Sequence, residues 1–451
     1  MKRTRLHVQL DRGRSLLLAV CLAMAATVAD GFENRPTGKA SWYKGNLHAH
    51  SLWSDGDDFP EMVADWYKQH RYQFLALTDH DRLMHGEHWA TLATPWDAVR
   101  RMSSNALIEK CRKRFGTDWV TVRQKDRFVQ EVKLKTFDEV RAQLNEPDKF
   151  LLLQGEEIFC RAGNRHVYLN AINLQEVILA KTRPNATDAI QAILGVADDQ
   201  SKRSRQPILT NVDHPYFDHF DVTPEELAHA KDLRFFEVAN QFGAAIHTKG
   251  DPFHPSIEKL WDVANTIRIA KLKCPPLYGL GSDDSHSHHE FSPHHYNPGR
   301  GWIMVRAARL TAESLIEAMN RGDFYASTGV VLRDLAYDAQ RRTIRLDIEP
   351  EPNVHYTIQF IGTVVGTDPT GKPLESVAKK GDRPGCKYSP NIGQVLASSK
   401  STSATYQLTG NELYVRALVR SDKSAKNAPD GGVQTETAWC QPVGWEGRVK
   451  R

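Results

Sequence analysis

The sequence has little cysteine and no paired-cysteine motif. Only 6 of its 451 residues are Cys, and no two of them have the C-x-x-C spacing of a zinc or redox site. This argues against a structural zinc site built from cysteines. Cys386 and Cys440 both lie in the C-terminal part and could form a disulfide after export, whereas the others are expected to be buried thiols.

There is also no basic run of the kind that binds nucleic acid. The formal net charge is +4 at pH 7. Residues 1–29 carry five basic side chains and one acidic side chain, which accounts for the whole of that charge. The rest of the chain is near neutral, so no nucleic-acid partner is expected.

No apolar run is long enough to span a bilayer comfortably. The run Leu16–Ala29 follows a positively charged segment and ends in small residues, a pattern typical of a signal peptide. We therefore expect residues 1–29 to be removed, by cleavage after Ala25 or Ala29. The mature protein would be soluble and periplasmic or extracellular; an uncleaved membrane anchor is the alternative.

A glycine-rich dinucleotide loop is absent as well. From about residue 40, roughly eight short apolar segments alternate with helical stretches, which is the pattern of β/α units. Ionisable residues gather where these segments end. The carboxyl ends of strands form the active-site face of both an α/β barrel and a doubly wound sheet. Because ligand-type residues follow nearly every strand, we predict the barrel.

The stretch Gly45–Gly56 carries the first potential metal ligands. His48 and His50 are two residues apart, so in an extended strand both imidazoles point to the same side. The turn Ser54-Asp55-Gly56 would bring the Asp55 carboxylate back toward them. Two imidazole nitrogens and a carboxylate oxygen suit Zn²⁺, Mn²⁺ or Fe²⁺.

Further histidines and carboxylates accompany later strands. The complete candidate set is His48, His50, Asp55, His80, Glu157, His166, His214, Asp284 and His286. This set is larger than one ion can use, so we expect two or three divalent metals (Zn, Mn or Fe) bridged by a carboxylate. His166 is unusual because it begins a strand, and Glu156 and Asp283 are alternatives to their neighbours.

As an ordered set, the motifs H-x-H-x-x-x-x-D-G, T-D-H, G-x-E, D-H-P and D-x-H resemble the polymerase-and-histidinol-phosphatase (PHP) superfamily of metal-dependent hydrolases. The resemblance covers about residues 44–290 and implies a distorted (β/α)₇ TIM-like barrel with a di- or trinuclear metal centre. Residues 322–329 resemble the exported or carbamate-hydrolase-like branch of that superfamily.

The resemblance also implies a ligand assignment. One metal would be held by His48, His50, Glu157 and Asp284. Another would be held by Asp55, His80 and His286. A third would be held by His166 and His214, with Glu157 bridging. The G-x-E motif favours Glu157 over Glu156, and D-x-H favours Asp284, although the order Gly-Ser-Asp-Asp-Ser-His keeps Asp283 as an alternative.

The expected chemistry is hydrolysis by a metal-bound water or hydroxide, with no side-chain nucleophile. Our leading interpretation is an exported phosphoesterase acting on a small anionic molecule, with Arg300 as a substrate-binding candidate. The alternatives are a hydrolase of carboxylic esters, carbamates or amides, and a metal-binding module without turnover.

We divide the chain into residues 1–29, a metallohydrolase barrel at 40–329 and a β-rich accessory domain at 330–451. Residues 82–148 form an insertion that would cover the site. In the last part Ile344, Leu346 and Ile348 alternate with polar residues, which predicts a small antiparallel all-β sandwich.

Overall fold

The computed structural model describes residues 40–92, 103–127, 129–216, 220–240, 249–377, 383–429 and 434–449. The predicted signal peptide lies outside these ranges. Among the helices inside them, none is long and apolar enough to cross a membrane.

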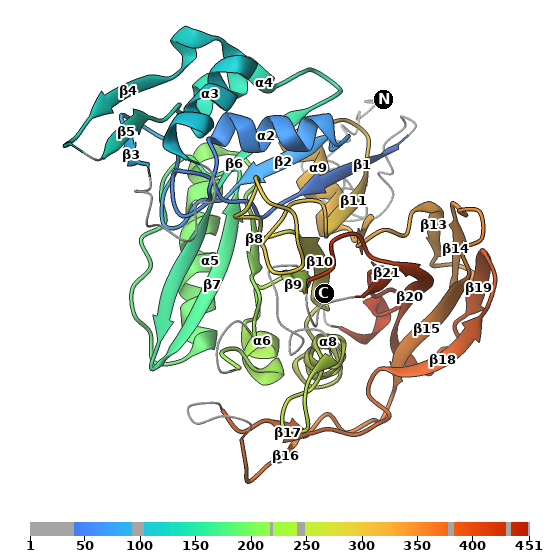
Figure 1. Cartoon of the computed structure of the whole chain (residues 1–451). Helices are drawn as coiled ribbons and strands as arrows, with labels where there is room; N and C mark the ends of the chain where they lie inside the picture. Colours follow the sequence, from blue (N-terminus) through green and yellow to red (C-terminus); the bar gives the residue numbers. More distant parts are fainter. Residues whose placement is uncertain are drawn as a thin grey trace, which may run out of the picture. The chain divides into compact units, whose positions relative to one another are not determined.

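Thirteen strands of the described residues form one mixed sheet (Figure 1). In spatial order they are β10 (Tyr278–Ser282), β9 (Phe235–Asn240), β8 (Leu209–Val212), β7 (Arg165–Ile172), β6 (Leu151–Ala162), β2 (Phe74–Leu77), β1 (Ser41–Asn46), β11 (Trp302–Ala307), β12 (Phe324–Ser327), β21 (Thr435–Cys440), β20 (Glu412–Ser424), β15 (Tyr356–Val364) and β18 (Gln394–Ser399). β1, β2 and β6 run parallel to one another, as do β8, β9 and β10. Their carboxyl ends meet at one edge, and the predicted ligands gather there.

The prediction of a (β/α)₇ barrel is not confirmed, because no ladder closes the sheet within the described residues. The sheet is strongly curved instead. An isolated bridge joins Ala49, just after β1, to Ser285, just after β10, and the amide of His50 donates to the Ser285 carbonyl over 2.9 Å. The fold is therefore mixed α/β, with a curved sheet that brings two distant strand ends together.

β6 and β7 form an antiparallel hairpin rather than a β/α unit. Gly163, in the connection between them, has φ of 61°, a left-handed conformation that favours glycine. β6 is 12 residues long, and its pairing with β2 ends at Gln154. Glu157 therefore lies in the part of β6 that continues past the end of β2 and pairs with β7.

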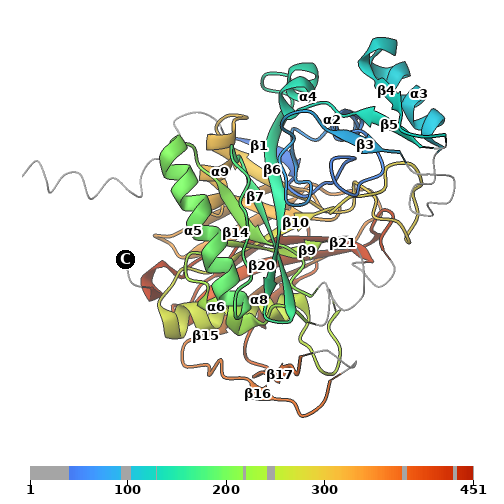
Figure 2. The same cartoon turned by 90° about the vertical axis from the view of Figure 1, so that its left-hand side faces the viewer.

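The helices are α2 (Pro60–Gln69), α3 (Ser104–Phe115), α4 (Phe137–Leu144), α5 (Ala186–Ser204), α6 (Pro224–His229), α8 (Ile257–Thr266), which continues as a π-helix to Leu272, and α9 (Ala312–Asn320). Two of these helices begin with a capping box, formed by Thr136 and Glu139 at α4 and by Thr223 and Glu226 at α6. Figure 2 shows α5 running along β7, where its buried face packs into the largest part of the core.

The insertion at 82–148 docks against α2. It contributes the small sheet β3 (Trp89–Thr91), β5 (Gln130–Lys133) and β4 (Thr121–Gln124), together with α3 and α4. Polar pairs tie it to the start and face of α2: Lys110 contacts Asp58, the Trp119 indole donates to Glu61, and Arg114 binds Asp65 through two bonds of 2.7 Å. The insertion is thus anchored directly behind the segment that follows His48 and His50.

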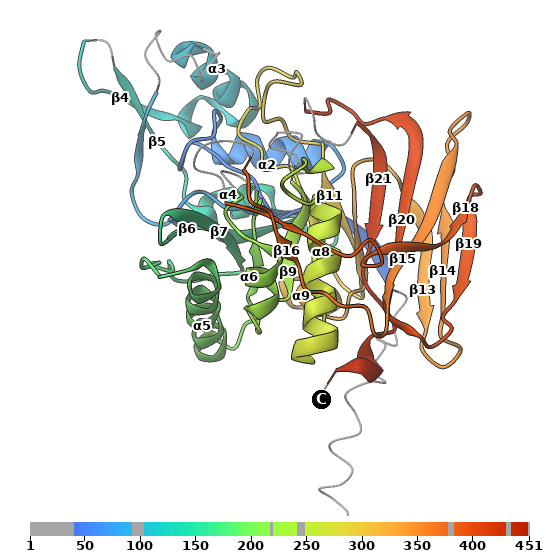
Figure 3. The ribbon, with the colours of Figure 1, turned by 90° about the horizontal axis from the view of Figure 1, so that it is seen from below.

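The C-terminal strands form two layers. β13 (Leu332–Asp338), β14 (Thr343–Ile348) and β19 (Ser403–Gln407) make a separate sheet that shares an apolar core with β15, β20 and β21 (Figure 3). The alternating burial in β14 matches the period-two pattern in the sequence. The domain boundary at 329/330 stays a prediction, since β12 pairs with β21 and the large sheet runs across it.

The disulfide considered for Cys386 and Cys440 is not formed: both are free thiols. Cys386 lies in the short hairpin of β16 (Lys372–Pro373) and β17 (Cys386–Lys387), whereas Cys440 is buried in β21. A buried thiol packed in a core strand behaves as a small apolar group.

A buried ion pair links α8 to β20, and its loss should be costly. The Arg416 guanidinium binds Asp262 at 2.9 and 2.7 Å, and both side chains are almost fully buried. We expect R416M to lower the free energy of unfolding by about 3–5 kcal/mol, because Asp262 would be left charged and unpaired. The double variant D262N/R416M should lose clearly less. Denaturant unfolding followed by tryptophan fluorescence measures both, and equal losses would contradict this account.

Candidate metal centre

His48 and His50 lie on the extended segment that follows β1. Both side chains are fully buried, and the His48 amide is held by the Asn46 side chain at 2.9 Å. The chain then turns back, with the amides of Ser54 and Gly56 both donating to the Ser51 carbonyl. A Cβ at Gly56 would lie 2.6 Å from the His50 backbone, so this return requires glycine. The turn carries Asp55 to His50, whose Nδ1 lies 3.5 Å from Asp55 Oδ1, whereas His48 and Asp55 fall in different ligand groups.

Four buried atoms converge beside these histidines. The Nε2 atoms of His48 and His50 each lie 3.3 Å from Glu157 Oε2, and they lie 3.3 and 3.2 Å from Asp284 Oδ1. We call the point between these four atoms the inner position. Ligand atoms about 2.0–2.1 Å from one metal ion are separated by about 3.3 Å in a tetrahedral site. The four nitrogen-to-oxygen distances match this value, so these atoms could share a metal ion.

The hydrogen bonding at the inner position supports the same interpretation. His48 Nε2, His50 Nε2 and Asp284 Oδ1 are buried and have no hydrogen-bond partner in the structure. Buried polar atoms in proteins normally have one. These atoms lie 3.2–3.3 Å from atoms of opposite type without forming hydrogen bonds, which is the arrangement expected of ligands that share a metal.

A second group of ligand atoms, which we call the outer position, is formed by His50, Asp55, His80 and His286. Asp55 lies 3.5 Å from His80 Nε2 and 3.4 Å from His286 Nε2. Glu157 also reaches His80, whose Nδ1 is 3.0 Å from Oε2. The side chains of Asp55 and His80 are 55% and 32% exposed, whereas those at the inner position are buried. The centre is thus open to solvent on the Asp55 side.

The structure brings His214 to the centre but not His166. His214 Nε2 lies 2.9 Å from Glu157 Oε1, and His214 groups with His48 and Asp284. In the β6–β7 hairpin, Glu157 pairs with Asn170, whereas His166 pairs with Arg161. Four residues of strand put His166 about 13 Å further along the hairpin. It belongs to none of the ligand groups found among the described residues.

The structure also separates the neighbouring carboxylates. Glu157 faces the centre, while Glu156 points to the other face of β6 and accepts from the Ile178 amide at 2.6 Å. Burial raises the pKa of Glu156 to about 7. Asp284, at φ 49°, faces the centre, whereas Asp283 accepts from the amides of Gly299, Arg300 and Gly301.

Negative charge at the centre is balanced by the imidazoles. Burial by itself would raise the pKa of Glu157, but His48, His214 and His50 outweigh it and lower the pKa well below its usual range. Burial likewise opposes charge on His50, yet Asp284 and Glu157 raise its pKa to about 10. The carboxylates thus favour positive charge beside them, and a divalent cation would supply it in place of the imidazole protons.

Glu237 lies at the centre but was not predicted from the sequence as a site residue. It is 2% exposed in β9, and its Oε1 lies 2.8 Å from His48 Nδ1. One acidic residue in the otherwise apolar run Phe-Phe-Glu-Val-Ala of β9 is the signal that could have found it. Two other carboxylates orient nearby segments: Asp79 accepts from Ser51 and Ser54 in the Asp55 turn, and Asp213 accepts from Asn170.

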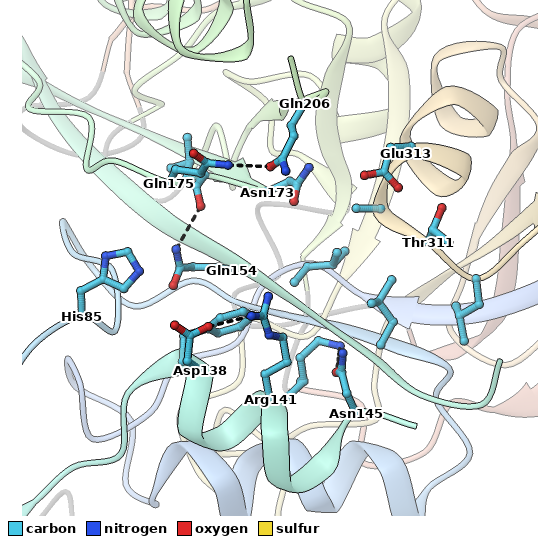
Figure 4. A pocket seen from close by; sticks show the side chains of 17 residues that line it. His85, Asp138, Arg141, Asn145, Gln154, Asn173, Gln175, Gln206, Thr311 and Glu313 are labelled. Carbon is cyan, nitrogen blue, oxygen red and sulfur yellow. Dashed lines mark hydrogen bonds and ion pairs between the residues drawn. The ribbon is translucent and has the colours of Figure 1, made fainter. Parts of the chain in front are cut away.

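Arg300 lies in the loop that binds Asp283. Its guanidinium donates to the Ser292 carbonyl at 2.7 Å and to Asn297 at 3.3 Å. A separate cavity of about 450 Å³ is lined by Gln154, Gln175 and Arg141 among others (Figure 4). No candidate ligand is among the described residues that line this cavity, so it is distinct from the centre.

No family model matches the sequence, and no curated protein matches it. Similar solved structures include a two-domain protein of Bacteroides vulgatus ATCC 8482 with a predicted PHP-like metal-dependent phosphoesterase. It is 14% identical over 89% of this chain and 96% of that one, with a TM-score of 0.35. A proposed metal-dependent phosphoesterase of Bifidobacterium adolescentis ATCC 15703 is 12% identical over 54% of this chain and 87% of that one, with a TM-score of 0.29. Both likenesses are weak and assign neither a family nor an activity to this chain.

The adjacent residues Glu156 and Glu157 offer a matched test of the centre. We expect E157Q to lose most of its bound metal, because Glu157 faces the inner and outer positions and His214. E156Q should keep the wild-type metal content, since Glu156 faces away. Elemental analysis after dialysis measures this, and equal metal content in the two variants would contradict the assignment.

Proposed function

We propose that this protein is a metal-dependent hydrolase of phosphoesters. The observation that carries the proposal is the inner position, where four buried ligand atoms converge at 3.2–3.3 Å without hydrogen bonding to one another. The outer position adjoins it: His50 Nδ1 lies 3.5 Å from Asp55 Oδ1, and Glu157 Oε2 lies 3.0 Å from His80 Nδ1. Two adjoining cation positions suit phosphoryl transfer, in which the attacking and the leaving oxygen both carry charge.

Each part of the centre has a distinct role in this proposal. Divalent metals, when bound, lower the pKa of a water molecule and stabilise the charge that develops on phosphate oxygens. Glu157 would contribute a ligand to both positions, because its Oε2 lies near His48, His50 and His80. Asp55 and His80 form the solvent-facing side through which a small substrate enters. Asp79 fixes the Ser51–Ser54 turn and so sets the placement of Asp55.

We propose two metals rather than three. A third would need His166 beside His214 and Glu157, and the register of the β6–β7 hairpin keeps His166 away from both. Zn²⁺, Mn²⁺ and Fe²⁺ all accept this mixture of imidazole and carboxylate ligands.

Activity on paired synthetic substrates tests the reaction class. We expect the metal-loaded protein to hydrolyse para-nitrophenyl phosphate or bis(para-nitrophenyl) phosphate, to lose this activity with a chelator, and to recover it with Zn²⁺ or Mn²⁺. E157Q should be inactive, with E156Q as the control. Hydrolysis only of para-nitrophenyl acetate or carbamates would instead indicate the ester and carbamate alternative. Bound metal with no turnover on either panel would indicate a metal-binding module.

We also propose that the protein is exported, on the basis of the charged and apolar segments in residues 1–29. When the full chain is produced in a bacterial host with a general secretion pathway, the mature protein should begin at Ala26 or Asp30. Intact-mass measurement of the periplasmic and membrane fractions shows this directly. A full-length chain confined to the membrane fraction would favour the uncleaved anchor.

A further inference from the structure

Glu237 joins four segments of the centre through one carboxylate. Oε1 accepts from His48 Nδ1 at 2.8 Å and from the Ser282 hydroxyl at 2.5 Å. Oε2 accepts from the His214 amide at 2.9 Å and from Asn240 Nδ2 at 2.7 Å. Ser282 and Asn240 are the last residues of β10 and β9, whereas His48 and His214 follow β1 and β8, so a single side chain links four strand ends.

The hydrogen bonds of Glu237 leave no room for it to be a metal ligand itself. An ionised carboxylate has about four lone-pair positions, and four donors fill them. Although Glu237 groups with His48 and Asp213 by distance alone, its oxygens are already directed at protein donors. Its influence on a metal must therefore pass through the groups that it binds.

The contact with His48 determines which imidazole nitrogen is available. Because Nδ1 donates its proton to Glu237, the lone pair is on Nε2, which is the buried atom without a hydrogen-bond partner at the inner position. A second route runs through Asn240, which also donates to Asp284 Oδ2 at 3.0 Å. Glu237 thus contacts one inner ligand and reaches another through a shared amide.

We propose that Glu237 is the positioning residue of the inner position, fixing the tautomer of His48 and the placement of His214 and Asp284. This inference rests on the proposed function, because it requires a metal at that position. It also explains a charged residue in the middle of an apolar strand. Glutamine cannot substitute, since its amide nitrogen would face two donors on one side.

The test compares E237Q with a matched control. Glu61 is equally buried and also accepts from side chains, at 2.7 Å from the Trp119 indole, but it lies on α2 outside the ligand groups. E61Q therefore reports the cost of neutralising a buried glutamate elsewhere in the fold. Calorimetric titration of the metal-free proteins with Zn²⁺ alone, and the visible spectrum of the Co²⁺-loaded proteins, give readouts independent of activity.

We expect wild type and E61Q to bind about two ions with equal affinity. E237Q should bind one of the two ions about 10–100-fold more weakly, still fill both positions at saturating Zn²⁺, and show a weakened Co²⁺ absorption. Unchanged affinity in E237Q would overturn the inference while leaving the proposed function intact. A saturating stoichiometry of one would make Glu237 a ligand and overturn the positioning role. An equal loss in E61Q would also overturn it.

Two further outcomes are distinguishable. Wild type that binds no metal would overturn the proposed function and this inference together. If E237Q does not fold, E237D keeps the charge but withdraws the carboxylate by one methylene, so it should fold and bind Zn²⁺ more weakly than wild type. Wild-type affinity in E237D would then overturn the inference.

Discussion

Buried negative charge is the constraint on which the edge of the sheet that carries the candidate ligands depends. A carboxylate removed from water is costly unless donors or cations surround it. Asp283 meets this need with three successive backbone amides at 299–301, and this closes the loop between β10 and β11. Glu237 meets it with four donors from four strand ends. Glu157 and Asp284 face the imidazoles instead, and Asp284 Oδ1 has no hydrogen-bond partner, so these two carboxylates are candidate metal ligands.

In two places, adjacent acidic residues face different partners. Along β6, consecutive side chains point to opposite faces, so Glu157 joins the centre while Glu156 binds the Ile178 amide. At Asp284 the left-handed backbone turns one carboxylate toward the imidazoles, while Asp283 holds the loop. In each pair one carboxylate binds backbone amides and the other faces the candidate metal positions. Because both members of a pair are buried acids, the motif alone could not decide which one is the ligand.

The sequence predicted much of this site because its signals are local. The spacing of His48 and His50, and the glycine of the Asp55 turn, specify their own geometry, and the structure brings these residues together with His80, Glu157, His214, Asp284 and His286. The predictions that the structure does not support depend on contacts between residues far apart in the chain. The register of the β6–β7 hairpin places His166 away from the centre, and this register could not be read from the sequence, although Gly163-Asn164 is a turn signal. The four partners of Glu237, and the curvature without a closing ladder, are likewise set by tertiary packing.

The continuation of the large sheet from β12 into β21 has a consequence for any attempt to shorten the chain. A protein ending near residue 329 would expose the unpaired backbone of β12 as a free edge. It would also uncover Tyr325, Trp42 and Met304, which now contact the C-terminal core. Free, apolar sheet edges invite pairing between molecules. The C-terminal strands therefore protect the part that carries the candidate metal centre against aggregation.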